Sequence, residues 1–138
     1  MSLFRRGPER SEVEAQLENV RGVVSILSLS RANLAVPESL LREAEASLAR
    51  NDTIRAMDAC GRAERIATSL EADYKAAAET VATLKTQIER MKALAMSVQD
   101  VEQALEAIHA RATSMRELDG TSIPDYAGAR ALAADAMG

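Results

Sequence analysis

The stretch at residues 70–95, LEADYKAAAETVATLKTQIERMKALA, decides how this chain folds. Its apolar residues recur at alternating spacings of four and three: Leu70, Tyr74, Ala77, Val81, Leu84, Ile88, Met91 and Ala95. After a one-residue slip they resume as Val98, Val101, Leu105, Ile108, Ala112 and Met115. Such a stripe forms one apolar seam along a helix and needs partner helices to cover it. The sequence therefore predicts an all-α fold without a sheet, an antiparallel helical bundle or helical-hairpin repeat built around one long helix.

The composition is that of an ordinary folded protein with a thin core. The 138 residues are 47% hydrophobic and 28% charged, but only 2% are aromatic. The net charge of -4 leaves no basic footprint for nucleic acid. A single cysteine excludes an intramolecular disulfide. No apolar run has the length of a membrane span, and residues 1–8 lack the apolar stretch of a signal peptide, so we expect a cytoplasmic protein.

Breakers and capping residues divide the chain. We expect a flexible N-terminal arm over residues 1–8 and a single helical domain over residues 9–138. Pro37 and Asn51 each suit a helix boundary, Pro37 in a first turn and Asn51 in the left-handed conformation of a C-cap. The slip near Met96 and Ser97 favours a break there, and one unbroken helix with a stammer is the alternative. The predicted helices cover about residues 9–34, 37–50, 52–95, 97–118 and 124–137. The chain is either a whole protein or a fragment of a longer helical array.

Three segments share an acid followed four residues later by alanine. They begin at Asp52, Asp73 and Asp125, and the last two continue with tyrosine as D-Y-x-x-A. This pattern loosely resembles the opening of second helices in tetratricopeptide-like repeats. The family's tryptophan, its Leu-Gly pair and its 34-residue period are missing. The resemblance implies a scaffold that binds peptides or proteins.

Two glycines fall inside predicted helices, where glycine costs about 1 kcal/mol relative to alanine. These are Gly22 and Gly61, and the second lies in a patch of small residues with Ala59, Cys60 and Ala63. We expect a close helix crossing at both glycines. A ligand cleft at the small-residue patch is the alternative, although no polar residues mark one.

The residues able to do chemistry are isolated from one another. Cys60 needs a nearby base to act as a nucleophile, so a buried, inert thiol is the favoured interpretation. Glu106 and His109, the only histidine, have the E-x-x-H spacing of di-metal bundles, but a second such pair is absent. Other charges pair along helices at spacings of three or four, as on a solvated face. The sequence therefore predicts no catalytic, cofactor-binding or metal-binding residue and no cofactor.

The pattern favours a non-enzymatic scaffold or protein-interaction module. We expect Leu84, Ile88 and Met91 to form an interaction seam, because the predicted helices at 9–34 and 37–50 are too short to cover it. The expected partners are a second copy of the chain and, additionally, a protein or peptide, with nucleic acid excluded and membrane contact disfavoured. One alternative is a membrane-associated polymerising scaffold with a basic tip at residues 4–6. The other is a helical-bundle enzyme or a metal- or ligand-binding protein.

Overall fold

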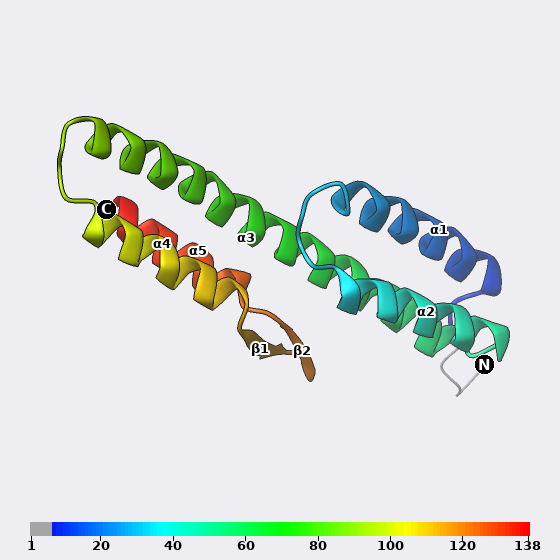
Figure 1. Cartoon of the computed structure of the whole chain (residues 1–138). Coiled ribbons are helices and arrows are strands. Elements are labelled where there is room, and N and C mark those ends of the chain that lie inside the picture. The colour runs from blue at the N-terminus through cyan, green and yellow to red at the C-terminus, as the bar shows by residue number, and fades with distance from the viewer. Residues whose placement is uncertain (1–6) are drawn as a thin grey trace. The chain divides into compact units, whose positions relative to one another are not determined.

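The chain is helical throughout most of its length and divides into two compact units. The computed structural model describes residues 7–138, so the predicted basic tip at residues 4–6 lies outside the described residues. Contacts gather within Met1–Ser69, called unit 1 here, and within Leu70–Gly138, called unit 2, whereas the sequence predicted one domain. Five helices and one small two-stranded sheet form the described part of the chain, which confirms the predicted all-α class (Figure 1).

Unit 1 is a bundle of three helical segments that run antiparallel in sequence order (Figure 1). They are α1 (Arg10–Leu27), α2 (Ala35–Ala49) and the first part of α3 (Thr53–Ala93). Each segment buries one apolar stripe, and the stripe of α3 consists mostly of small side chains. The buried side chains of these segments include Val13, Leu17, Val20, Val24, Leu40, Leu41, Ala44, Leu48, Ala56, Ala59, Cys60, Ala63, Ile66 and Ala67.

The first helix is shorter than predicted. It ends at Leu27 rather than near residue 34, because serine hydroxyls cap its last turn. Ser28 Oγ donates to the carbonyl of Ser25 at 2.7 Å, and Ser30 Oγ donates to that of Leu27 at 2.9 Å. These bonds satisfy carbonyls that have no partner within the helix, and they compete with its continuation.

Both ends of the α2–α3 connection agree with the sequence prediction. Asn51 has a φ of 61°, the left-handed conformation expected for a C-cap. The amides of Asp52 and Asn51 donate to the carbonyls of Ser47 and Leu48, which is the Schellman pattern. Asp52 Oδ1 then accepts from the Arg55 amide at 3.1 Å and caps α3. Three residues, Arg50, Asn51 and Asp52, thus suffice to reverse the chain.

Unit 2 contains the rest of α3, two further helices and a β-hairpin. The elements after α3 are α4 (Gln99–Ala112), β1 (Met115–Leu118), β2 (Thr121–Pro124) and α5 (Tyr126–Met137). The helices α4 and α5 run antiparallel and pack along each other (Figure 1). The latter part of α3 joins them, so unit 2 also has three helical segments in antiparallel order.

The long stripe breaks between α3 and α4, as the phase slip near Met96 predicted. Ala95 has a φ of 56°, and the amides of Met96 and Ala95 donate to the carbonyls of Met91 and Lys92. This is a second Schellman motif, here with alanine where glycine is usual. The single unbroken helix is therefore excluded.

A β-hairpin replaces the end of the fourth predicted helix, and the expectations of a helix over residues 97–118 and of no sheet are wrong. Asp119 and Gly120 have φ values of 51° and 75°. Two successive residues at positive φ form the I′ type of turn, whose twist suits a hairpin and which Asp-Gly favours. Met115 pairs with Pro124 at the open end, where the Asp125 amide also donates to the carbonyl of Ser114 at 2.9 Å.

The last helix begins two residues later than predicted because Ile123 and Pro124 belong to β2. Asp125 caps it: Oδ1 accepts from the Gly128 amide at 2.9 Å. Four residues after this cap, Ala129 is fully buried, as Ala56 is four residues after the Asp52 cap of α3. Two of the three acid-to-alanine segments therefore open helices in the same way. The third, at residues 73–77, lies inside α3.

Two long-range contacts tie α3 to α5 within unit 2. The rings of Tyr74 and Tyr126 meet edge to face, with centroids 5.2 Å apart and an interplanar angle of 66°. Arg130 Nη1 donates to Asp73 Oδ1 at 3.1 Å. These contacts fix α5 against one face of α3.

Candidate interaction surfaces

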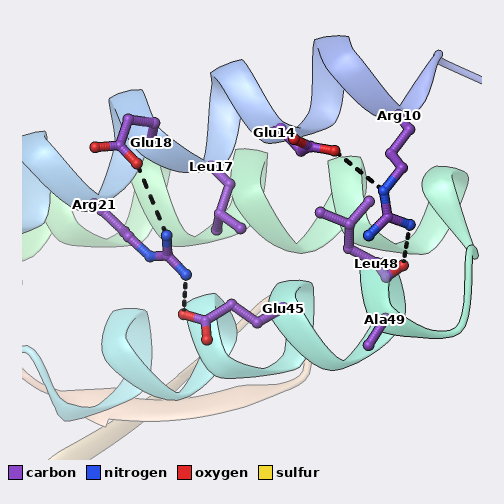
Figure 2. Close-up of a pocket in the computed structure, with 8 residues that line it drawn as sticks. All are labelled: Arg10, Glu14, Leu17, Glu18, Arg21, Glu45, Leu48 and Ala49. Atoms are coloured by element: carbon purple, nitrogen blue, oxygen red, sulfur yellow. Dashed lines mark hydrogen bonds and ion pairs between the residues drawn. The ribbon is translucent and has the colours of Figure 1, made fainter.

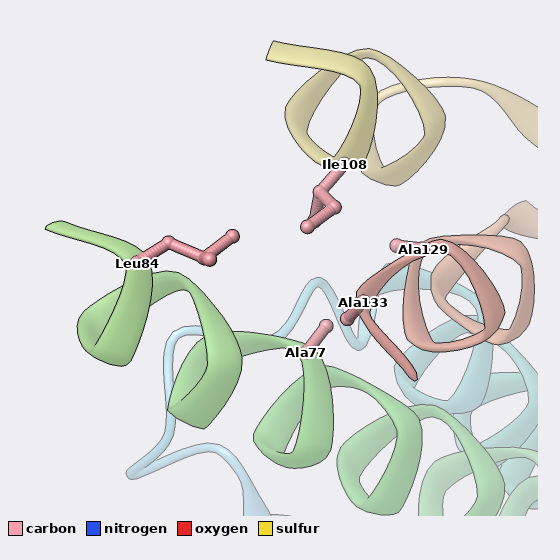
Figure 3. Close-up of a cluster of buried hydrophobic side chains, with 5 residues drawn as sticks. All are labelled: Ala77, Leu84, Ile108, Ala129 and Ala133. Atoms are coloured by element: carbon pink, nitrogen blue, oxygen red, sulfur yellow. The ribbon is translucent and has the colours of Figure 1, made fainter. Parts of the chain in front are cut away.

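The predicted interaction seam is the inside of unit 2. Leu84 is 3% exposed and Ile88 is 9% exposed, whereas Met91 is half-buried. Figure 3 shows Leu84 and Ala77 of α3 directed toward Ile108 of α4 and Ala133 of α5. The prediction that this seam lies open for a second copy is therefore wrong. Helices that follow the seam in the chain fold back and cover it.

The two glycines assigned to a close helix crossing do not form one within the described residues. A methyl group added at Gly22 would meet nothing within 4 Å, and one added at Gly61 would meet only the Arg65 side chain. The close approach occurs instead at Gly128, where an added Cβ would lie 2.8 Å from Arg111 Cγ and would collide with Asp125. A glycine within a predicted helix does not by itself indicate that another helix packs against that position.

A groove of about 380 Å³ lies between α1 and α2 in unit 1 (Figure 2). Charged side chains cross it at two places. Arg21 donates to Glu45 Oε1 at 2.6 Å, and Arg10 donates to the carbonyl of Leu48 at 2.9 Å. The eight side chains that line it are those of Arg10, Glu14, Leu17, Glu18, Arg21, Glu45, Leu48 and Ala49.

The charges of this groove are matched to one another. The Glu45 carboxylate, which accepts a hydrogen bond from Arg21, raises the pKa of that guanidinium. Glu18 and Glu14 pair with Arg21 and Arg10 along α1. A polar ligand would have to displace these pairs, so the arrangement is better suited to holding α1 beside α2 than to binding.

A second charged cluster holds the hairpin against the start of α5. The Asp125 carboxylate, 11% exposed, lies 3.4 Å from Arg111 Nη1 and 3.7 Å from Arg116 Nε. The same carboxylate caps α5 through the Gly128 amide. Arg116 Nε is buried and makes no hydrogen bond. One carboxylate thus joins α4, β1 and α5, and the sequence offered no signal for this because its partners are distant in the chain.

Two helix-to-helix turns expose large apolar side chains. At the α1–α2 turn, Ile26 in the last turn of α1 is 68% exposed and Leu29 after it is 86% exposed. In the α3–α4 turn, Leu94 is 72% exposed and Met96 is 54% exposed. Turns at the surface of a folded protein are normally polar, so exposed apolar groups there are informative. The α3–α4 turn is visible in the sequence as an uncharged, largely apolar stretch at residues 94–98, whereas the α1–α2 turn also contains Arg31 and two serines.

Cys60, Glu106 and His109 are the residues that the sequence analysis considered for chemistry. Cys60 is buried, and burial raises the pKa of its thiol, which Arg21 opposes only in part. A protonated thiol is a poor nucleophile. Glu106 and His109 are both exposed on α4. Among residues 7–138 no group of three or more His, Cys, Asp or Glu side chains is placed to hold a metal ion.

Comparison with known proteins adds no relative. No family model, no curated protein and no solved structure matches this chain. Within the described part of the chain, no helix combines the length and the apolar character needed to cross a bilayer.

Proposed function

We propose that the chain is a non-enzymatic helical scaffold that binds a protein partner through the α3–α4 turn. The observation that carries this proposal is the pair Leu94 and Met96, exposed on either side of Ala95, whose φ is 56°. A left-handed conformation costs an alanine about 1–2 kcal/mol. Backbone strain of this kind gathers at functional positions. Methionine, being flexible and polarisable, also suits an adaptable contact.

The charges around this turn favour a protein as the partner. Arg90 and Lys92 precede it on α3, and Asp100 and Glu102 follow it on α4. An apolar centre with a rim of both signs is the usual composition of a protein–protein contact. The tetratricopeptide-like resemblance points in the same direction. We place the protein in the cytoplasm, where the single Cys60 stays reduced.

Self-association remains part of the proposal, with a different contact. Leu84 and Ile88 are buried, so a second copy would have to use Leu94 and Met96. Two such turns related by a two-fold axis could meet in an isologous contact. Sedimentation of the unmodified chain and of the double variant Leu94→Ser/Met96→Ser tests this, because only the unmodified chain should form the dimer.

The decisive experiment is photocrosslinking in the cells that make the protein. A photoreactive amino acid at Leu94 should give one discrete adduct with a protein, and mass spectrometry then identifies the partner. The matched control carries the same group at Ala82, an exposed position on α3. Adducts that are absent at Leu94, or the same at both positions, would contradict the proposal.

A further inference from the structure

The α1–α2 turn differs from the α3–α4 turn in its charge. We propose that it is a membrane-contact site, which places Ile26 and Leu29 in the interface of a bilayer containing anionic lipids. This inference goes beyond the proposed function and uses a different part of the chain. The two proposals can therefore fail separately.

The first observation is the exposure of the apolar tip. Ile26 and Leu29 are 68% and 86% exposed, and Leu29 is the most exposed of the large apolar side chains described. They lie at the end of α1 and in the turn that follows it. A projecting turn can enter the shallow interfacial zone of a bilayer without a complementary cavity, whereas a protein partner would need to supply one.

The second observation is that the polar groups of the turn are satisfied locally. The amides of Ser28, Leu29 and Ser30 donate to the carbonyls of Val24, Ile26 and Leu27, respectively. The hydroxyls of Ser28 and Ser30 also donate to backbone carbonyls, at 2.7 and 2.9 Å. Unsatisfied polar groups are what oppose entry into a low-dielectric medium. These internal bonds lower that opposition.

The third observation is the charge of the segment. No carboxylate occurs between Glu18 and Glu38, and the charged residues in this interval are two arginines. Arg21 pairs with Glu45, and Arg31 is exposed in the turn itself. A lone cation beside an apolar tip is complementary to an anionic lipid surface. In sequence, the first carboxylate after Leu29 is that of Glu38 in the first turn of α2, nine residues later, whereas Asp100 of α4 follows Met96 by four residues.

The test is binding of the full chain to vesicles. It should sediment with vesicles of phosphatidylcholine and phosphatidylserine in equal parts, less with phosphatidylcholine alone, and less as salt is raised. Ile26→Ser/Leu29→Ser should reduce the partition coefficient at least about tenfold, and Arg31→Ala about fivefold. The matched control Met115→Ser/Met137→Ser, which removes two other exposed apolar side chains, should bind as the unmodified chain does.

A serine variant that failed to fold would also lose binding, so a fluorescence measurement provides a second test that does not depend on a loss of binding. The chain has no tryptophan, so Leu29→Trp introduces a single probe. Its emission should shift to the blue on addition of the anionic vesicles, and brominated lipid should quench it. Leu94→Trp, also at an exposed leucine in a turn, should show neither change.

The proposal is overturned by any of three results. One is that the unmodified chain does not bind the anionic vesicles. Another is that Ile26→Ser/Leu29→Ser binds as well as the unmodified chain, which would place the contact elsewhere. The third is that Leu29→Trp shows no shift with vesicles, as expected if this turn docks on a protein instead.

Discussion

Units 1 and 2 have the same length and the same succession of three antiparallel helical segments, but they reverse direction differently. In unit 1, Arg50, Asn51 and Asp52 alone lead into the last segment. In unit 2, a whole β-hairpin occupies that place. Both last segments nevertheless begin with an aspartate cap and a buried alanine four residues later. The capped start, rather than the connection before it, is the feature that the two units have in common.

The cores of the units differ as well. In unit 1, α1 buries three valines and one leucine and α2 buries three leucines, whereas α4 of unit 2 buries only Ile108. The side chains around the unit 2 core that stay partly exposed are Val81, Val101, Leu105, Ala112 and Leu132. Less apolar area removed from water means less stabilisation, so unit 2 should be the weaker unit. Substitutions at matched positions can break or sharpen this comparison.

The largest effect should come from truncating a core leucine in each unit. Leu84→Ala in unit 2 and Leu17→Ala in unit 1 should each lower the free energy of unfolding by about 2–5 kcal/mol. Because unit 2 has less to lose, Leu84→Ala should unfold it while unit 1 stays protected from hydrogen exchange. The exposed control Leu94→Ala should change stability by less than about 0.5 kcal/mol. Equal loss of protection in both units with either variant would show that they unfold as one.

A methyl group at two helical glycines should have opposite effects. Gly128→Ala should destabilise unit 2 by about 1–3 kcal/mol, because the added Cβ displaces the Asp125 carboxylate and meets Arg111. Gly22→Ala should stabilise unit 1 by about 1 kcal/mol, since nothing lies within 4 Å of the new group. Thermal unfolding measures both. If Gly128→Ala instead stabilises the protein, the Asp125 and Arg111 side chains can move aside at little cost.

Removing each of the two aspartate caps should lower the stability by different amounts. Asp52 caps α3, whereas Asp125 caps α5 and also pairs with Arg111 and Arg116. Asp52→Ala should cost about 1 kcal/mol, the ordinary value for a lost N-cap. Asp125→Ala should cost about 2 kcal/mol, because Arg111 and the buried Nε of Arg116 lose their counter-charge as well. Urea unfolding followed by circular dichroism provides both values. Equal losses would show that the arginines add nothing to the cap.

The smallest effect concerns the two Schellman turns. Ala95→Gly should stabilise unit 2 by about 0.5–1 kcal/mol, since glycine adopts the positive φ without the steric penalty of a Cβ. Asn51→Gly should change unit 1 by less, because asparagine already tolerates that conformation. The difference in melting temperature between the two variants measures the strain at Ala95. If Ala95→Gly gives no gain in stability, Ala95 is not strained, and backbone strain no longer supports the proposed function.

The local features of this fold could be predicted from the sequence, but the long-range ones could not. The α1 stripe and the Asn51 reversal follow from periodicity and backbone preference, which act over a few residues. The hairpin was missed because Met115 continues the heptad spacing, although Asp119-Gly120 is a strong hairpin signal. The seam at Leu84 was recognised as a seam, but periodicity does not say whether the same chain or a second one covers it. The ion pairs of Asp125 with Arg111 and Arg116 join residues that only the folded chain brings together.

The edge-to-face tyrosine pair gives unit 2 its own optical signature. Tyr74 and Tyr126 are the only tyrosines, both lie in unit 2, and the chain has no tryptophan. Near-ultraviolet absorbance and dichroism of tyrosine therefore monitor unit 2 almost alone, whereas the far-ultraviolet helical signal sums both units. If the weaker unit melts first, the two spectral regions will show transitions that do not coincide, and a single melting temperature will not describe this chain.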